Sequence, residues 1–221
     1  MKTYAELREM AVARKGEDGL EAVMPVPPAI RMADQSDDRI LADFTKRVFQ
    51  AGFNWTVIEN KWPGFEEAFH GFDIGRNAMM SDEDLDAHLR DTRIVRNAQK
   101  ILTVRDNVVF LSDLAREHGS AAACLGNWPL EDTIGLFALL KARGARLGGV
   151  TGQYALRSLG LENFILTKSV VAALNMAGVI DGAATSKSAQ AKVQAAFNQW
   201  AAESGESHAR ISRMLAAAVP D

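Results

Sequence analysis

Apolar residues along this chain recur every three or four positions, the spacing of one face of an α-helix, and strict alternation over several turns is absent. The segment from Ile40 to Phe49 is a clear example, with Leu41, Phe44 and Val48 in helical register. We therefore predict an all-α fold: a compact multi-helix bundle, with room for two lobes, that forms a single helical domain over residues 1–221.

Capping residues and helix breakers divide this pattern into about ten expected helices. Ser36, followed by two aspartates, predicts the start of a helix that ends at Gly52, and Ser81 with Asp84 resembles a capping box. The same signals predict a helix at 3–13, a proline-bearing loop at 24–30, a short helix starting at Pro63, a helix at 93–118, a linker at 120–123, helices at 129–143 and 151–159, and two more capped by Thr167 and Ser186, the last running to about Val219.

Composition places the chain among globular proteins. Hydrophobic residues make up 48% and charged residues 24% of 221 positions, which argues against disorder and fibrous repeats. No apolar run approaches the roughly 18 residues that a membrane span requires, and the N-terminus lacks the pattern of a signal peptide. A single cysteine, Cys124, fits a reducing compartment, so we predict a cytoplasmic protein without a membrane partner.

The net charge of −3 conceals an asymmetry between the two ends of the chain. Residues 141–213 carry nine basic and four acidic side chains, whereas residues 1–140 are strongly acidic. The basic end is where a polyanion such as nucleic acid would bind. Solvated surfaces also produce such imbalances by chance, so the charge alone does not identify a partner.

A glycine-rich turn from Leu147 to Gly152 separates two predicted helices, and together they span about 132–159. Glycines permit a tight turn, and the following helix then presents free backbone N–H groups to an anion, as in a helix-hairpin-helix that grips a DNA phosphate. A plain glycine cap between packed helices explains the same residues equally well. The candidate DNA-binding residues in this region are Gly148, Gly149, Gly152, Arg146 and Arg157.

Aromatic and amide side chains are concentrated after the helix that ends near Gly52. A flat heteroaromatic ring could stack and hydrogen-bond there, although aromatic residues at helical spacing more often form a core. The candidate base-pocket residues are Trp55, Gln50, Phe49, Asn54 and Trp62.

Several blocks of the sequence resemble, in order and spacing, the DNA-3-methyladenine glycosylase I family. These blocks are Gln50–Trp55, Phe69–Asp73, Ile94–Ile101 and Asp106–Asn107, and the similarity resumes from Lys141 to Leu161. The resemblance implies a helix-hairpin-helix glycosylase of base-excision repair, which flips an alkylated purine such as 3-methyladenine from duplex DNA and cleaves its N-glycosidic bond. It also implies that Trp55 is the pocket tryptophan. We expect a monomer without a cofactor.

Three departures from the family pattern qualify this reading. Arg47, a further candidate base-pocket residue, stands where the family carries a glutamate that reads the base. A cation facing a cationic base has the wrong sign, so either Arg47 turns away from the pocket or the ligand differs. The family's terminal zinc-binding cysteines and histidines are absent, so we predict no metal. Lys168 lies where related glycosylases place a catalytic aspartate, and we expect it to contact DNA phosphate. The catalytic residue stays unknown, and a DNA-binding protein of the same fold without excision activity is the alternative.

Overall fold

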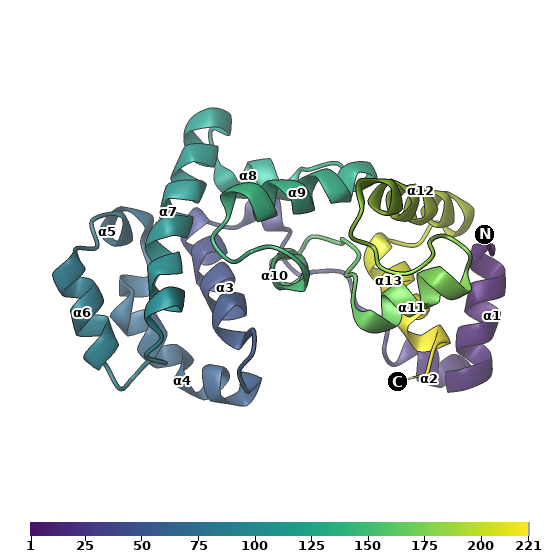
Figure 1. Ribbon diagram of the computed structural model, residues 1–221, viewed down its shortest axis with the longest axis horizontal. Helices are drawn as coiled ribbons and strands as arrows, with labels where there is room; N and C mark the ends of the chain where they lie inside the picture. The colour runs from purple at the N-terminus through teal and green to yellow at the C-terminus, as the bar shows by residue number, and fades with distance from the viewer. Residues whose placement is uncertain (221) are drawn as a thin grey trace. The chain divides into compact units, whose positions relative to one another are not determined.

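The computed structural model describes residues 1–220 and contains thirteen α-helices and three short 3-10 helices, with no strand in that part of the chain (Figure 1). The predicted all-α class is confirmed. None of these helices is both long enough and apolar enough to cross a membrane. The chain divides into two compact units.

The first unit, here the terminal unit, combines residues 1–29 and 128–136 with the chain from 162 onward. Its helix α1 lies along α13, as Figure 1 shows in purple and yellow. Buried aromatic rings form its centre, with Phe164 stacked on Phe197 at 4.2 Å between ring centroids and Trp200 packed edge-on against Phe197. The helices are α1 (Tyr4–Lys15), α2 (Glu17–Glu21), η3 (Leu130–Asp132), α11 (Lys168–Met176), α12 (Lys187–Ser204) and α13 (His208–Ala218).

The second unit, here the central unit, combines residues 30–127 and 137–161. Its helix α3 packs against α7 and α10, and the fully buried Ile40, Leu41 and Phe44 of α3 supply much of the core. The helices are η1 (Met32–Asp34), α3 (Asp37–Gln50), α4 (Trp55–Ala68), η2 (His70–Phe72), α5 (Ile74–Ala78), α6 (Asp82–Arg90), α7 (Ala98–His118), α8 (Ala121–Gly126) and α10 (Val150–Ser158). Helix α9 (Thr133–Arg143) begins in the terminal unit and ends in the central one. The expectation of a single domain stays a prediction.

Several predicted helix ends are confirmed by the capping contacts. Ser81 and Asp84 form a reciprocal capping box at the start of α6, and Thr167 and Ser186 accept backbone N–H groups at the starts of α11 and α12. Ser36 begins α3, but its side chain makes no cap hydrogen bond. Instead Asp37 accepts the N–H groups of two residues at the start of α8.

Four predicted boundaries are wrong because a polar side chain caps a helix elsewhere. Helix α4 begins after Asn54 and runs through Pro63, and α7 begins after Asn97 rather than at residue 93. The expected linker at 120–123 is the start of α8, where the Ser120 hydroxyl accepts an N–H. The last expected helix is two helices, because Gly205 takes a left-handed φ of 73° and Ser207 caps α13.

Candidate functional site

A tight turn between α3 and α4 builds the candidate site. Gly52 adopts a φ of 75°, which favours glycine, and the N–H of Phe53 closes the turn on the carbonyl oxygen of Gln50 at 3.1 Å. The side chain of Asn54 then accepts the N–H of Thr56 at 2.9 Å and starts α4. Trp55 is therefore the first residue of a helix whose direction the turn fixes.

A buried lysine holds this turn in place. The Nζ atom of Lys100, on α7, donates to the carbonyl oxygens of Phe49 at 3.1 Å and Ala51 at 2.6 Å, which are among the last carbonyls of α3. Burial, together with the charge of Arg146, lowers the pKa of Lys100 below its usual value. The ammonium group also lies 4.6 Å from the ring centroid of Phe53. Lys100 thus fastens the turn to α7.

Trp55 projects an accessible indole ring next to α10. The residue is 48% exposed, and its ring packs edge-on against Tyr154 of α10 with 5.9 Å between centroids. Phe53 is 42% exposed on the same turn. Exposed aromatic rings fixed by neighbouring side chains are suited to stacking on a planar ligand.

Arg47 joins the end of α3 to Trp55 and to α10. Its guanidinium carbon lies 5.6 Å from the Trp55 ring centroid, its Nη1 donates to Gln50 Oε1 at 2.9 Å, and its Nε donates to Ser158 Oγ at 3.3 Å. Its Nε is also 3.6 Å from the carboxylate of Asp43. Arg47 therefore lies beside Trp55 rather than turned away from it.

Two carboxyl groups are the candidates for an acidic catalytic residue. Burial raises the pKa of the Asp43 carboxyl above its usual value, although Arg47 and the Ser158 hydroxyl partly oppose the shift. Glu59 is held by Lys46 at 2.7 Å and accepts a hydrogen bond from the Gln50 side chain at 3.0 Å. Both carboxylates therefore have protein partners.

The structure brings Arg47, Gln50 and Trp55 together and gives the other expected pocket residues different places. Phe49 is fully buried and packs edge-on against Phe65, so it belongs to the core. Asn54 caps α4, as described above. Trp62 stacks on Phe65 at 5.4 Å, and its Nε1 donates to Glu66 at 3.0 Å.

The glycine turn, residues 144–149, connects α9 to α10. The glycines in this turn and in the first turn of α10 play different roles. Gly149 precedes α10 with a φ of 61° and a ψ of −149°, a conformation essentially restricted to glycine. Gly152 lies inside α10, where a Cβ atom would stand 2.1 Å from the carbonyl oxygen of Leu147. Gly148 has room for a side chain. The turn thus packs directly on the first turn of α10, while the helix-hairpin-helix assignment stays a prediction.

The predicted DNA-binding cations are divided between the units. Arg146 is exposed on the glycine turn and donates to the side chain of Gln99, and Arg157 is half-buried on α10. Lys168 is the first residue of α11 and belongs to the terminal unit, where it is exposed. The central unit therefore holds every candidate DNA contact except Lys168.

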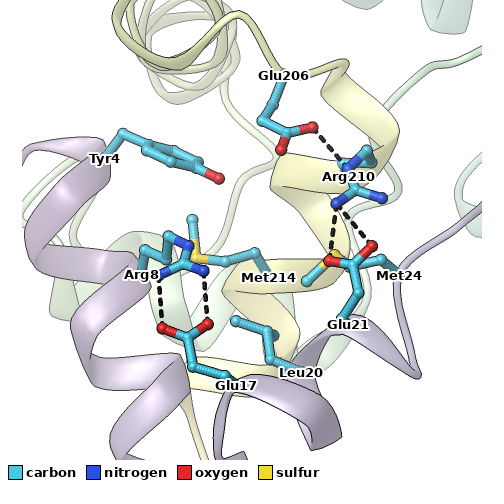
Figure 2. Close-up of a pocket in the computed structure, with 9 residues that line it drawn as sticks. All are labelled: Tyr4, Arg8, Glu17, Leu20, Glu21, Met24, Glu206, Arg210 and Met214. Atoms are coloured by element: carbon cyan, nitrogen blue, oxygen red, sulfur yellow. Dashed lines mark hydrogen bonds and ion pairs between the residues drawn. The ribbon is translucent and has the colours of Figure 1, made fainter.

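A second charged site lies in the terminal unit, around a cavity of about 60 Å³ (Figure 2). Arg210 pairs with Glu206 at 2.6 Å and with Glu21 at 3.0 Å, and Arg8 pairs with Glu17 at 2.6 Å. Figure 2 draws these contacts as dashed lines. Each of these arginines is thus ion-paired with a carboxylate at the cavity, and the cavity is too small for a nucleobase. The site therefore fits a structural clasp between α1, α2 and α13.

Zinc ligation, which the resemblance raises, does not fit the residues of this chain. Within residues 1–220, no three His, Cys, Asp or Glu side chains are grouped so that they could hold a metal ion. Cys124 is half-buried on α8, and burial raises the pKa of its thiol, which disfavours the thiolate that binds zinc.

Sequence reasoning missed three residues of the site. Tyr154 and Ser158 lie one helical turn apart on α10, so one face of that helix meets both Trp55 and Arg47. Lys100 lies within one of the blocks used for the resemblance, but nothing in its local pattern indicates that it fastens the turn after α3. All three residues reach the site through contacts between positions that are more than 45 residues apart in the sequence.

Comparison with known proteins supports the fold and the central unit in particular. A methyladenine glycosylase family model matches residues 32–134, which confirms the resemblance seen in the sequence. The match ends before the glycine turn. The DNA-3-methyladenine glycosylase of Haemophilus influenzae is 33% identical over 58 residues, which is 26% of this chain and 31% of that relative. The aligned part thus spans about a third of the curated relative.

Solved structures resemble a larger part of the chain. The 3-methyladenine DNA glycosylase I from Staphylococcus aureus superposes with a TM-score of 0.53 at 21% identity, over 69% of this chain and 91% of that protein. A tyrosine-to-phenylalanine variant of 3-methyladenine DNA glycosylase I, solved with 3-methyladenine bound, gives 0.52 at 21% identity over 70% and 91%. This likeness establishes a shared fold.

Proposed function

We propose that this chain, which has the fold of 3-methyladenine DNA glycosylase I, is a monofunctional DNA glycosylase. It would extrude a damaged purine from duplex DNA and hydrolyse the N-glycosidic bond, the activity that the resemblance implies for alkylated purines such as 3-methyladenine. The single cysteine fits a reducing compartment and so supports action in the cytoplasm. We propose that the protein acts as a monomer.

The exposed ring of Trp55 carries this proposal. Large aromatic side chains are normally buried, yet this one begins a helix, stands 48% exposed and is fixed by Tyr154 and Arg47. Extruded bases are held by aromatic stacking together with a few polar groups, and Arg47, held by the buried Gln50, supplies such a group beside the ring. Binding would therefore place the base on Trp55.

Cleavage of a purine that alkylation has made cationic needs no activated protein nucleophile. An alkylated purine that carries a positive charge has a weakened glycosidic bond, so a pocket that holds the extruded nucleotide can provide much of the rate enhancement. Water then completes the hydrolysis at C1′. The half-buried Asp43 is the side chain we propose for orienting that water, acting through its contacts with Ser158 and Arg47.

The DNA backbone would bind at the start of α10. We propose that the glycine turn and α10 form a helix-hairpin-helix, in which the N–H groups after Gly149 face a phosphate. Val150 and Tyr154 lie one turn apart, so the phosphate-binding end of α10 adjoins the ring that contacts Trp55. Phe53 is proposed to fill the space that the extruded base leaves, as apolar wedges do in bent duplexes.

Base release tests this function directly. The purified protein is incubated with duplex DNA that carries methylated purines in one sample and deaminated purines in another, and free bases are separated by chromatography. We expect release of at least one modified purine, with an equal number of abasic sites. Duplex binding without release from either sample would instead establish the alternative, an inactive DNA-binding protein, which the cation beside Trp55 favours.

A negative charge at the start of α10 should weaken DNA binding. Val150 is the first residue of the helix and 42% exposed, so Val150→Glu suits the helix dipole and should preserve the fold. The carboxylate would repel the phosphate, and affinity should fall about tenfold at low salt. Salt-dependent titration of any duplex sequence measures the effect.

The matched control is Val109→Glu. Val109 is 57% exposed on α7. It lies about 200° around the helix from Asn107, whose side chain bonds Ala145 of the glycine turn, so Val109 faces away from that turn. The two variants change the net charge equally, so only a local contact distinguishes them. Equal affinities for the two variants would remove the start of α10 from the interface.

A further inference from the structure

A fixed positive charge lies against the ring that would receive the base. The guanidinium of Arg47 is 5.6 Å from the Trp55 ring centroid, and its side chain is only 18% exposed. Arginine stays protonated at every pH at which a protein is folded. Any base stacked on Trp55 therefore meets this charge.

Three contacts keep the guanidinium at this position. Gln50 Oε1 accepts from Nη1, Ser158 Oγ accepts from Nε, and Asp43 lies beyond Nε at 3.6 Å. These contacts use Nε and Nη1, and a guanidinium carries five N–H donors in a planar fork. The group is thus held in place and can still donate to a ligand.

One carboxylate lies close to Arg47, and further charged groups surround the same turn. Asp43 is the closest counter-ion, 3.6 Å from Nε of Arg47, and its carboxylate also accepts a hydrogen bond from Ser158. The ammonium group of Lys100 lies beneath the turn, and the carboxylate of Glu59 is paired with Lys46. A base beside Trp55 therefore meets the guanidinium of Arg47, which donates hydrogen bonds and accepts none.

Resting on the proposed glycosylase function, we infer that Arg47 directs this site toward neutral purines with an acceptor-rich edge and away from purines with a fixed positive charge. The oxygen on C6 and the ring nitrogen N7 of a 6-oxopurine, such as hypoxanthine, match the two parallel donors of an arginine fork. A purine made cationic by alkylation repels the guanidinium instead.

The same charge would assist cleavage of a neutral base. When the bond between C1′ and N9 breaks, its electron pair passes to the purine, and the negative charge spreads over N9, N7 and O6. Arg47 stabilises that charge through hydrogen bonds and keeps its own protons. Water adds to C1′ and loses a proton to the solvent, and the departing purine takes up a proton from the solvent.

Binding of isolated bases tests the inference without requiring catalysis. Nuclear magnetic resonance titration compares neutral 9-methylhypoxanthine with 3,9-dimethyladeninium, a permanent cation of similar size. The parent protein should bind the neutral base at least tenfold more tightly, Arg47→Glu should reverse the order, and the uncharged Arg47→Met should remove most of the preference. Equal affinities in the parent protein, or a preference for the cation, would overturn the inference.

Excision by the same proteins separates this inference from the proposed function. The parent should release hypoxanthine from duplex DNA at least tenfold faster than 3-methyladenine, and Arg47→Glu should release 3-methyladenine faster than the parent does. Faster release of 3-methyladenine by the parent, unimproved in Arg47→Glu, overturns the inference and leaves the glycosylase function standing. If no protein releases any base, the glycosylase function fails, and the binding titration decides the role of Arg47. Arg47→Met replaces Arg47→Glu if melting shows that the latter is unfolded.

Discussion

Replacing Trp55 with alanine should reduce excision of the damaged purine about tenfold or more, because base–aromatic stacking is worth roughly 1–3 kcal/mol per base. The indole is half exposed and contacts Tyr154 by its edge, so its removal should lower the melting temperature only slightly. Single-turnover release of the base and thermal unfolding are measured on the same preparation.

Trp128→Ala is the matched control. Trp128 is a half-buried tryptophan of the terminal unit, and its Nε1 donates to the carbonyl oxygen of Asp132 at 2.9 Å. Its loss should leave excision unchanged. A folded Trp55→Ala protein that binds and excises bases as well as the parent would make the aromatic residues after α3 simply a part of the core.

Replacing Gly152 with alanine should lower the free energy of unfolding by about 1–3 kcal/mol, the usual cost of forcing atoms into a well-packed site. The new Cβ would stand 2.1 Å from the backbone oxygen of Leu147, and a carbonyl in a tight turn cannot move aside as a flexible side chain can. The glycine turn would shift away from α10, so DNA affinity should fall as well. Denaturant unfolding and duplex titration measure both effects.

Gly148→Ala makes the same chemical change a few residues earlier. The added carbon would lie 3.4 Å from Cγ of Lys141, an ordinary contact with a flexible side chain, so stability should change by less than about 0.5 kcal/mol. If Gly152→Ala were as stable as Gly148→Ala, the close packing of the turn on α10 would be refuted.

Helix starts were predictable where a capping serine or threonine stands directly before a periodic apolar run. Ser81, Thr167 and Ser186 begin their helices as expected, because a hydroxyl next to a periodic run has a local partner. Asn54 and Asn97 were missed, since Pro63 and the apolar residues near 94 are stronger local signals than an asparagine. The capping hydrogen bonds of the two asparagines decided these boundaries.

The candidate site was predictable only in part. Arg47 and Gln50 are three residues apart on one helix, and a short turn leads to Trp55, so their proximity follows from the chain itself. Tyr154 and Ser158 reach the same place from α10, about a hundred residues later. Helical periodicity gives the face of α10 but not its partner, which is why the sequence alone left the orientation of Arg47 open.

The order in which the two units are encoded has a consequence for synthesis on the ribosome. The central unit is complete once residue 161 has emerged, whereas the terminal unit needs α1 from the beginning of the chain and α13 from its end. Domains fold as units during translation. Helix α1, with α2 packed beside it, therefore lacks its partner until α13 leaves the exit tunnel, and during that interval its apolar face is open to chaperones and proteases.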